Sequence, residues 1–340
     1  MIIPEFLKQG DSIGVTATSD GVSDPLDQKR FNNGKEQLER RGFKIKFTRN
    51  VFSADEKGRS STGAERGRQI SELIADEDVR MVIAAKGGNF LNEMLPHIDF
   101  ERWVRSPKWF QGYSDNTGLI HTLTTKYDMA AVYGSNFGEF GMEPWHGSVE
   151  NNLRVLSGGC REQHSFDRYQ KEMSERITGL EGYLEDTPVR WKTAGTGNDG
   201  LDKVKIRGRL LGGCLDVLIF LQGTKYDNTP EYIRKYKEDG VLWYLESFDM
   251  SGESLMMFLW QLKEIGWFRY SSGFIFGRPL FYKDYTNTDY EEAVLYALGD
   301  LGVPVILDCD FGHRGPRMTV INGALAEVEY ENGSGILRYI

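Results

Sequence analysis

Short apolar runs and amphipathic stretches alternate along the first half of the chain. Apolar runs at positions 11–18, 44–52 and 79–88 predict buried strands, and shorter ones follow at 109–115 and 129–135. Between them lie charged stretches with helical spacing, such as FNNGKEQLERRG and ERGRQISELIADEDV. Strands separated by helices of this length predict an α/β fold with a parallel, doubly wound sheet.

Three of these predicted strands end in small and polar residues, in the stretches TATSDG, AKGGN and GYSDN. The carboxyl ends of parallel strands meet at one edge of a sheet, and ligands of such sheets bind there. We therefore expect the three stretches to lie together along one edge.

The regular pattern breaks between residues 167 and 204, a charged segment that includes LEDTPVRWKTAGTGNDG. Such a segment is typical of an interdomain connection that carries a mobile loop. Strand and helix patterns resume after it and end in a predicted β-hairpin with its turn at 331–333. We therefore predict an N-terminal α/β domain (1–166), a linker with a substrate loop (167–204) and a C-terminal domain (205–340).

Charge and hydropathy exclude several classes of protein. The 340 residues carry a formal net charge of -9, so no basic surplus is present to neutralise nucleic acid or an anionic membrane. No run approaches the roughly 18 apolar residues of a membrane span. The first residues, MIIPEFLKQGDSIGV, lack the pattern of a signal peptide, so a cytoplasmic protein is expected.

The sequence favours neither a metal site nor a cofactor. Cys160, Cys214 and Cys309 are too widely spaced for a disulfide framework or a zinc motif. The stretch KGGNF (86–90) offers two glycines at a strand end but lacks both G-x-G-x-x-G and the P-loop lysine pattern. We therefore expect no cofactor and no metal.

Ser114 stands between a predicted strand and a predicted helix, which allows two interpretations. It can cap the helix, with its hydroxyl accepting from an N–H group of the first turn. It can also be a nucleophile on a strand–turn–helix corner, although the G-x-S-x-G spacing is absent. The helix beginning there would direct free N–H groups toward a developing negative charge.

A serine nucleophile needs a base and an acid that orients the base. His313 follows an apolar run and has glycines on both sides, which favours it over the other four histidines: His97, His121, His146 and His164. Glu246 ends the apolar run GVLWYLE, where a carboxylate is costly unless paired. Asp308 and Asp310 are rivals for this role, but their closeness to His313 in sequence suggests that they shape its loop.

Several motifs resemble those of the LD-carboxypeptidase family of serine peptidases, which includes the microcin C self-immunity proteins. These are GDSIGVTATSD, KGGN, GYSDNTGL, RLLGGCLDVL followed by GTKYDNTP, WYLES and FGHRGPRMTVINGALAEV, in family order over nearly the whole chain. The resemblance implies a Ser114–Glu246–His313 triad and an oxyanion hole from the backbone N–H groups of Gly88 and Asp115. It also implies a flavodoxin-like N-terminal domain, a smaller mixed C-terminal domain and a homodimer.

The chain departs from the commonest family pattern at positions that can line the substrate cleft. Lys86 replaces an arginine, Asn89 and Phe90 replace Tyr-Gly, GSNFG replaces a Gly-Pro, and Cys214 replaces an asparagine. Lys86 and Asn89 are therefore candidate substrate-binding residues, and Trp191 in the segment 167–204 is a third.

Two substrate classes remain open within the family, a murein tetrapeptide and a peptidyl- or aminoacyl-nucleotide compound. Chain length, the GGCLD variant and the segment holding Trp191 favour the nucleotide compound. On a mobile loop Trp191 can stack on a nucleobase, or it can instead pin the linker to the domain surface. A non-catalytic, two-lobed binding protein is the alternative from another class.

Overall fold

The computed structural model describes residues 1–195 and 202–340, and this part of the chain forms two compact units. The first unit comprises residues 1–160, 174–183 and 319–321. The second unit comprises residues 161–173, 184–318 and 322–340. Within these ranges no helix has both the length and the apolar character that crossing a membrane requires.

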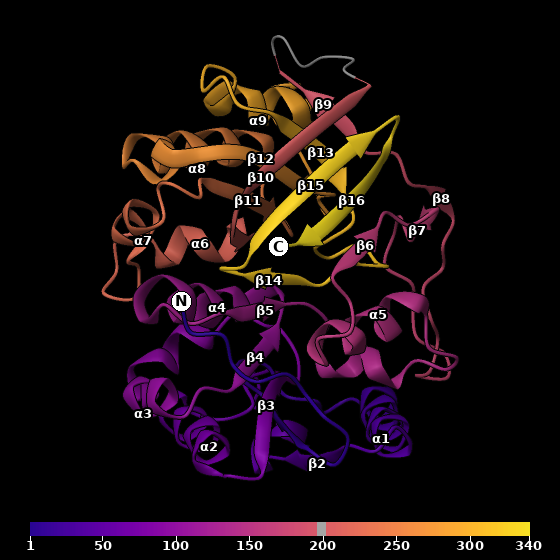
Figure 1. Cartoon of the computed structure of the whole chain (residues 1–340). Coiled ribbons are helices and arrows are strands. Elements are labelled where there is room, and N and C mark those ends of the chain that lie inside the picture. The colour runs from indigo at the N-terminus through magenta and orange to yellow at the C-terminus, as the bar shows by residue number, and fades with distance from the viewer. Residues whose placement is uncertain (196–201) are drawn as a thin grey trace. The chain divides into compact units, whose positions relative to one another are not determined.

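The first unit is built on a six-stranded sheet in the order β14-β5-β4-β3-β1-β2 (Figure 1). Strands β2, β1, β3, β4 and β5 are joined in parallel, in the 2-1-3-4-5 order of flavodoxin-like folds, so the predicted parallel sheet is confirmed. The strands are β1 (Ser12–Thr16), β2 (Lys44–Phe47), β3 (Val79–Ala84), β4 (Trp109–Gly112), β5 (Ala131–Tyr133) and β14 (Val320–Asn322).

Helices cover both faces of this sheet: α2 and α3 lie on one side of β3 and β4, and α1 and α5 on the other (Figure 1). Their starts follow from the sequence, since Asp24 accepts from two N–H groups of the first turn of α1 and Thr62 caps α2. The helices are α1 (Pro25–Arg40), α2 (Gly63–Ala75), α3 (Phe100–Arg105), α4 (Thr117–Tyr127) and α5 (Gly147–Leu156).

Short 3₁₀ helices lie in several of the segments that connect the strands and α-helices of the first unit. They are η1 (Arg49–Phe52), η2 (Leu91–Glu93), η3 (Leu95–His97), η4 (Ser114–Asn116) and η5 (Phe137–Gly141). The apolar run 44–52 was expected to be one strand, but it leaves the sheet after Phe47. Asn50 causes this turn, because its side chain donates to the carbonyl of Ala17 and to the hydroxyl of Ser60.

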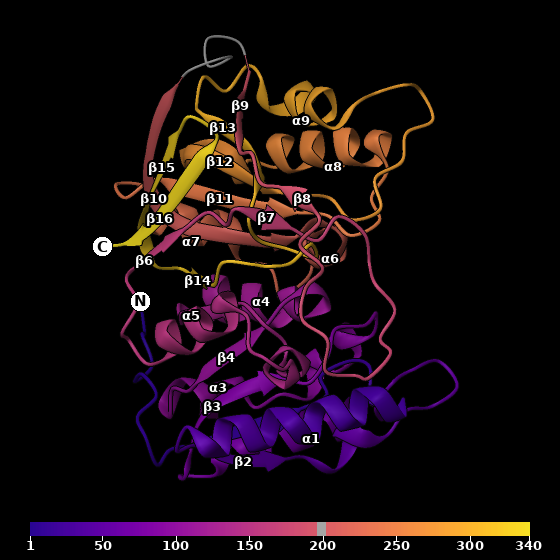
Figure 2. The same cartoon turned by 90° about the vertical axis from the view of Figure 1, so that its right-hand side faces the viewer.

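The second unit contains an eight-stranded mixed sheet in the order β6-β16-β15-β10-β11-β12-β13-β9 (Figure 2). Strands β10 to β13 are parallel, and antiparallel strands extend the sheet on both sides. They are β6 (Glu162–His164), β9 (Lys192–Ala194), β10 (Lys203–Cys214), β11 (Val241–Glu246), β12 (Ser271–Gly277), β13 (Val305–Cys309), β15 (Leu325–Glu331) and β16 (Ser334–Tyr339).

The helices of the second unit are short, and the two longest, α8 and α9, pack against each other (Figure 2). The described helices are α6 (Leu215–Leu221), α7 (Thr229–Lys235), α8 (Gly252–Glu264), α9 (Tyr290–Leu298) and the 3₁₀ helix η6 (Trp267–Tyr270). The mixed α/β character predicted for the C-terminal part is thereby confirmed.

The segment predicted as linker and loop carries strands in its described part. A two-stranded sheet joins β7 (Arg168–Tyr169) to β8 (Thr187–Pro188), and β9 pairs with β13. The positions 196–201 of this segment lie outside the described residues. The predicted hairpin is confirmed: β15 and β16 flank a turn in which Asn332 and Gly333 both have positive φ, as a type I′ turn requires.

Candidate active site

In the first unit, the ends of β1, β3 and β4 gather at one edge, as expected from the sequence. Phe90 N donates to Ser19 Oγ at 2.9 Å, which joins the segments that follow β3 and β1. Asn116 completes the arrangement, because it accepts from Thr18 Oγ1 at 2.5 Å and donates to the carbonyl of Lys86 at 3.2 Å. These hydrogen bonds fix the three strand ends next to one another.

Ser114 is held in an unusual backbone conformation at this edge. Its φ is 65°, in the left-handed region that non-glycine residues rarely adopt. The chain leaves β4 at Gly112, turns at Ser114 and continues through η4 into α4, a strand–turn–helix corner. The residues that precede η4 and α4 are Tyr113 and Asn116, so the cap positions do not fall on Ser114. Strain at a corner of this kind is typical of a functional residue.

The paired glycines after β3 allow close approach to Ser114. A Cβ atom on Gly87 would lie 3.1 Å from Ser114 Oγ and 3.9 Å from the backbone nitrogen of Asp115. Gly88 has a φ of 146°, and a Cβ there would lie 2.3 Å from Asp20 Oδ1. Gly88 admits no side chain, and a Cβ on Gly87 would require Ser114 to shift, so the two glycines let the backbone approach the Ser114 side chain closely.

The Asp115 side chain binds the segment after β3. It is 7% exposed and accepts from Leu91 N at 2.9 Å, which ties the corner to η2. Burial raises the pKa of this carboxyl, and the hydrogen bond from Leu91 opposes the shift. The Asp115 side chain therefore links the segments that follow β3 and β4.

Asp20 was not recognised from the sequence as a site residue. Its Oδ1 is buried and meets no hydrogen-bond partner among the described residues, and burial raises the pKa of its carboxyl. The signal was its place in TATSDG, directly after β1 at the sheet's topological switch point. Lys86 and Asn89, predicted to bind substrate, lie exposed at this edge, and Lys86 pairs with Asp27 at 3.5 Å.

In the second unit, Glu246 and His313 form a buried pair. Oε2 of Glu246 lies 2.8 Å from Nδ1 of His313, and their side chains are 0% and 8% exposed. Gly312 makes this contact possible, because a Cβ there would lie 2.8 Å from Glu246 Oε2 and its φ is 96°. The ring of Phe248 packs on the imidazole at 4.8 Å. The imidazole is therefore oriented by a carboxylate on one side and an aromatic ring on another.

The rival acids have other partners. Asp310 is fully buried and binds Arg278 Nη2 at 2.7 Å and Trp191 Nε1 at 3.0 Å. Asp308 lies 3.8 Å from Lys192. Of the three acids considered from the sequence, Glu246 is the one that the structure brings to His313.

Trp191 is buried, which contradicts its predicted place on an open loop. The ring is 2% exposed, and a Cβ on Gly335 would lie 2.0 Å from it, so β16 covers one face. The indole N–H donates to Asp310. A ring enclosed in this way presents no open face on which a nucleobase could stack. The alternative, a tryptophan that pins this segment to its domain, fits these contacts.

Cys214 lies beside the Glu246–His313 pair, a proximity that spacing in the sequence did not reveal. The parallel register of β10 and β11 sets Cys214 opposite Glu246. One ligand-type atom from each of Cys214, Glu246 and His313 lies within 4.8 Å of the other two. Burial raises the pKa of the Cys214 thiol well above its ordinary value, and the charge of Glu246 raises it further. The thiol is therefore a neutral neighbour of the pair at physiological pH.

Comparison with known proteins assigns the family. The LD-carboxypeptidase N-terminal domain model matches residues 13–134, and the LD-carboxypeptidase C-terminal domain model matches residues 207–328. The chain belongs to the LD-carboxypeptidase family. It is therefore a peptidase, and the resemblance seen in its motifs is confirmed. Ser114 lies within the first matched range, and Glu246 and His313 lie within the second.

Several family members align with nearly the whole chain. A carboxypeptidase-like protein of Vibrio cholerae is 26% identical, with 98% of this chain and 96% of the relative covered. The microcin C7 self-immunity protein MccF of Escherichia coli is 25% identical, with 96% and 92% covered. The probable murein peptide carboxypeptidase of Bacillus subtilis is 22% identical, with 98% and 93% covered.

Solved structures of this LD-carboxypeptidase family share the fold. MccF in its wild-type apo state matches with a TM-score of 0.81 at 23% identity, covering 100% of this chain and 99% of MccF. MccF in complex with aspartyl sulfamoyl adenosine matches with the same TM-score at 22% identity and the same coverage. At these identities the likeness establishes the two-domain fold.

Proposed function

We propose that this LD-carboxypeptidase family member is a serine-type hydrolase that cleaves an amide bond through an acyl-enzyme. Ser114 is the nucleophile, His313 the general base and Glu246 the residue that orients the base. The backbone N–H groups of Gly88 and Asp115 bind the oxyanion. The observation that carries the proposal is the buried hydrogen bond between Glu246 and His313.

The proposed reaction requires Ser114 of the first unit and His313 of the second to meet in the working enzyme. His313 Nε2 takes the proton of the Ser114 hydroxyl as its oxygen attacks the substrate carbonyl. With Nδ1 donating to Glu246, the imidazolium that forms is stabilised by the carboxylate. The tetrahedral intermediate collapses, the leaving amine takes the proton from His313, and water then releases the acyl group by the same route.

The first unit supports the role of Ser114 in two ways. Its left-handed backbone is the strain expected of a nucleophile on a sharp corner. The glycine pair of residues 87 and 88 allows backbone N–H groups to approach, and each oxyanion donor can lower the barrier by about 3–4 kcal/mol.

The proposed substrate is a peptidyl- or aminoacyl-nucleotide compound, as in the microcin-immunity branch of the family. Support comes from MccF, which is similar over nearly the whole chain and whose solved complexes contain aspartyl sulfamoyl adenosine and glutamyl sulfamoyl guanosine. An MccF-like protein from Streptococcus pneumoniae, solved in complex with AMP, also matches, with a TM-score of 0.74. Trp191 no longer supports this choice, since its ring is enclosed.

A murein tetrapeptide is the second candidate substrate. Its support is the similarity to the probable murein peptide carboxypeptidase of Bacillus subtilis.

A homodimer is also proposed, on the family resemblance, and sedimentation at several protein concentrations tests it.

A side-by-side assay of an aminoacyl sulfamoyl adenosine and a murein tetrapeptide tests the proposed function. The wild-type protein should hydrolyse the nucleotide compound faster, and Ser114→Ala should abolish hydrolysis while leaving the thermal transition unchanged. An organophosphonate probe should label Ser114 in the wild type, as peptide mass spectrometry would report. Undiminished turnover by Ser114→Ala would refute the assignment, and a protein that binds both compounds without cleaving either would be the non-catalytic binder.

A further inference from the structure

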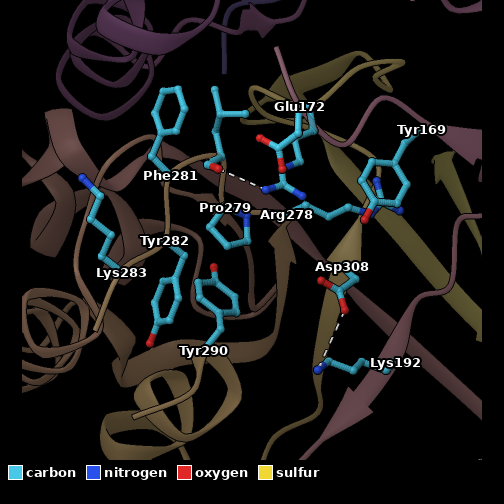
Figure 3. A pocket seen from close by; sticks show the side chains of 12 residues that line it. Tyr169, Glu172, Lys192, Arg278, Pro279, Phe281, Tyr282, Lys283, Tyr290 and Asp308 are labelled. Carbon is cyan, nitrogen blue, oxygen red and sulfur yellow. Dashed lines mark hydrogen bonds and ion pairs between the residues drawn. The ribbon is translucent and has the colours of Figure 1, made fainter. Parts of the chain in front are cut away.

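A pocket of about 430 Å³ lies entirely within the second unit (Figure 3). Its walls come from the segment that follows β12, from the ends of β7, β9 and β13, and from the loop that holds His313. This volume lies within the range of small-molecule sites. The lining residues that matter here are Tyr169, Glu172, Lys192, Arg278, Tyr290, Asp308 and Arg314.

The pocket adjoins the proposed general base. Arg314, a lining residue, follows His313 directly in the chain. Phe281, another lining residue, packs edge-on against Phe248 at 5.2 Å, and Phe248 packs on the His313 ring at 4.8 Å. Two aromatic rings, Phe281 and Phe248, therefore connect the pocket to the imidazole within the same unit.

Two cations of the pocket are already neutralised by carboxylates of the protein. Arg278 pairs with the fully buried Asp310 at 2.7 Å, and the Tyr169 ring covers its guanidinium at 4.2 Å. Lys192 lies 3.2 Å from Glu291 and 3.8 Å from Asp308. These contacts build the wall of the pocket and leave little capacity to bind a further anion.

Arg314 differs from both. Among the described residues, its Nη2 donates to the carbonyl of Leu280 at 3.0 Å, and its buried Nε has no hydrogen-bond partner. No carboxylate of the described chain lies within 4 Å of its guanidinium nitrogens. A buried N–H group of a cation without an acceptor is costly, and an oxyanion is the group that satisfies it best.

The other titratable groups of the pocket also influence which charge a bound ligand can carry. Glu172 and Asp308 are the two lining acids, and burial raises the pKa of the Asp308 carboxyl while Lys192 opposes the shift. Asp308 is engaged by Lys192, and Glu172 is exposed at the rim. Tyr290 is neutral, because burial raises its pKa well above the ordinary value. Lys283, the fourth lining cation, is exposed and has no carboxylate partner among the described residues, whereas Arg314 combines the lack of such a partner with a buried N–H group that has no acceptor.

We propose that this pocket is a subsite for an anionic group of the substrate, a carboxylate or a phosphate, and that Arg314 binds that group. The assignment rests on the proposed hydrolase function and names a specificity-determining residue for it. A guanidinium presents two parallel N–H donors, which match the two oxygens of a carboxylate or a phosphate. Arg314 thereby selects substrates that carry a negative charge on the part of the molecule that occupies this pocket.

Binding to the Ser114→Ala protein tests this subsite without requiring turnover. Calorimetry would compare a short peptide that ends in a free carboxylate with the same peptide ending in an amide, and would include AMP as a phosphate ligand. We expect the Ser114→Ala protein to prefer the acid peptide or to bind AMP, and Arg314→Gln to weaken that anionic ligand by about 10- to 100-fold. Amide-peptide binding should change little, and Arg314→Lys should restore part of the loss.

Arg269→Gln is the matched control, because this exposed arginine of the second unit does not line the pocket. It should leave all three affinities unchanged. Loss of acid-peptide affinity alone identifies a carboxylate subsite, and loss of AMP affinity alone identifies a phosphate subsite. Equal affinities of Arg314→Gln and its parent for both anionic ligands would overturn the proposal, as would equal losses for the acid and amide peptides.

These outcomes are independent of the proposed reaction. A wild-type protein that hydrolyses neither candidate substrate, but binds an anion through Arg314, would contradict the proposed function and retain the subsite. The opposite outcome is hydrolysis by the wild type together with a ratio of kcat/KM for the acid peptide to kcat/KM for the amide peptide that is the same in Arg314→Gln and the wild type. It would retain the function and eliminate the subsite.

Discussion

Replacing Glu246 by glutamine removes the charge that orients the proposed base while keeping the shape of the side chain. In the protein, Glu246 Oε2 lies 2.8 Å from His313 Nδ1, and the two side chains are 0% and 8% exposed. An imidazolium forms in the proposed transition state, and a buried carboxylate about 4 Å from its charge stabilises it by about 4 kcal/mol at an effective dielectric constant of 20. Each 1.36 kcal/mol corresponds to a tenfold change in rate, so kcat should fall about a thousandfold.

The loss should appear in kcat, because the carboxylate does not contact the substrate in this mechanism. Single-turnover kinetics on the substrate that the wild type hydrolyses would measure it, with Glu238→Gln as the control at a glutamate whose side chain is 90% exposed. In a His313→Ala background, Glu246→Gln should have no further effect, since the two residues act as a unit. A fall of less than tenfold, or a full additional loss in the His313→Ala background, would refute the proposed pairing.

Two further predictions concern the edge of the first unit. Gly87→Ala should lower kcat about tenfold or more with little loss of stability, because the added Cβ would lie 3.1 Å from Ser114 Oγ and displace it. Gly147→Ala is the control and should keep full activity, because a Cβ there meets nothing within 4 Å. Asp115→Asn keeps the acceptor for Leu91 N and removes a carboxyl whose pKa burial raises. The folded wild type holds this proton more tightly than the unfolded chain, so its stability falls as pH rises above the ordinary value of 3.8, and urea unfolding should favour the variant increasingly with pH. A difference between variant and wild type that stays constant with pH would contradict this explanation.

Most of the sheet of the first unit could be predicted from local pattern because the parallel strands β1, β3, β4 and β5 are buried on both faces. β1 and most of β3 read as continuous apolar runs for this reason. The run at 44–52 was harder to interpret, since its second half is apolar and yet forms η1. Asn50 decides the outcome by binding Ala17 and Ser60, and a single sequence does not disclose such contacts.

The candidate site could be predicted where its residues sit in a recognisable local context. Ser114 ends a strand before a helix, and His313 lies between glycines, so both were visible as candidates without knowledge of their partners. The partner acid had rivals in Asp308 and Asp310, and only their closeness to His313 in sequence argued against them. Arg278 and Trp191 engage Asp310 from distant parts of the chain, and this leaves Glu246 as the partner of the imidazole.

The surroundings of Trp191 and Cys214 could not be predicted for one physical reason: they are set by strand pairing across long separations in sequence. Trp191 appears in a segment without period, yet it is buried because β9 pairs with β13 and Gly335 of β16 leaves room for its ring. Cys214 reaches the Glu246–His313 pair because β10 and β11 are in parallel register. In both cases the residue type and its local sequence do not indicate which residues will surround it. From sequence alone, both residues can be taken for surface residues, since Cys214 follows paired glycines and Trp191 lies in a polar segment. The pairing of the strands around them is what buries both side chains.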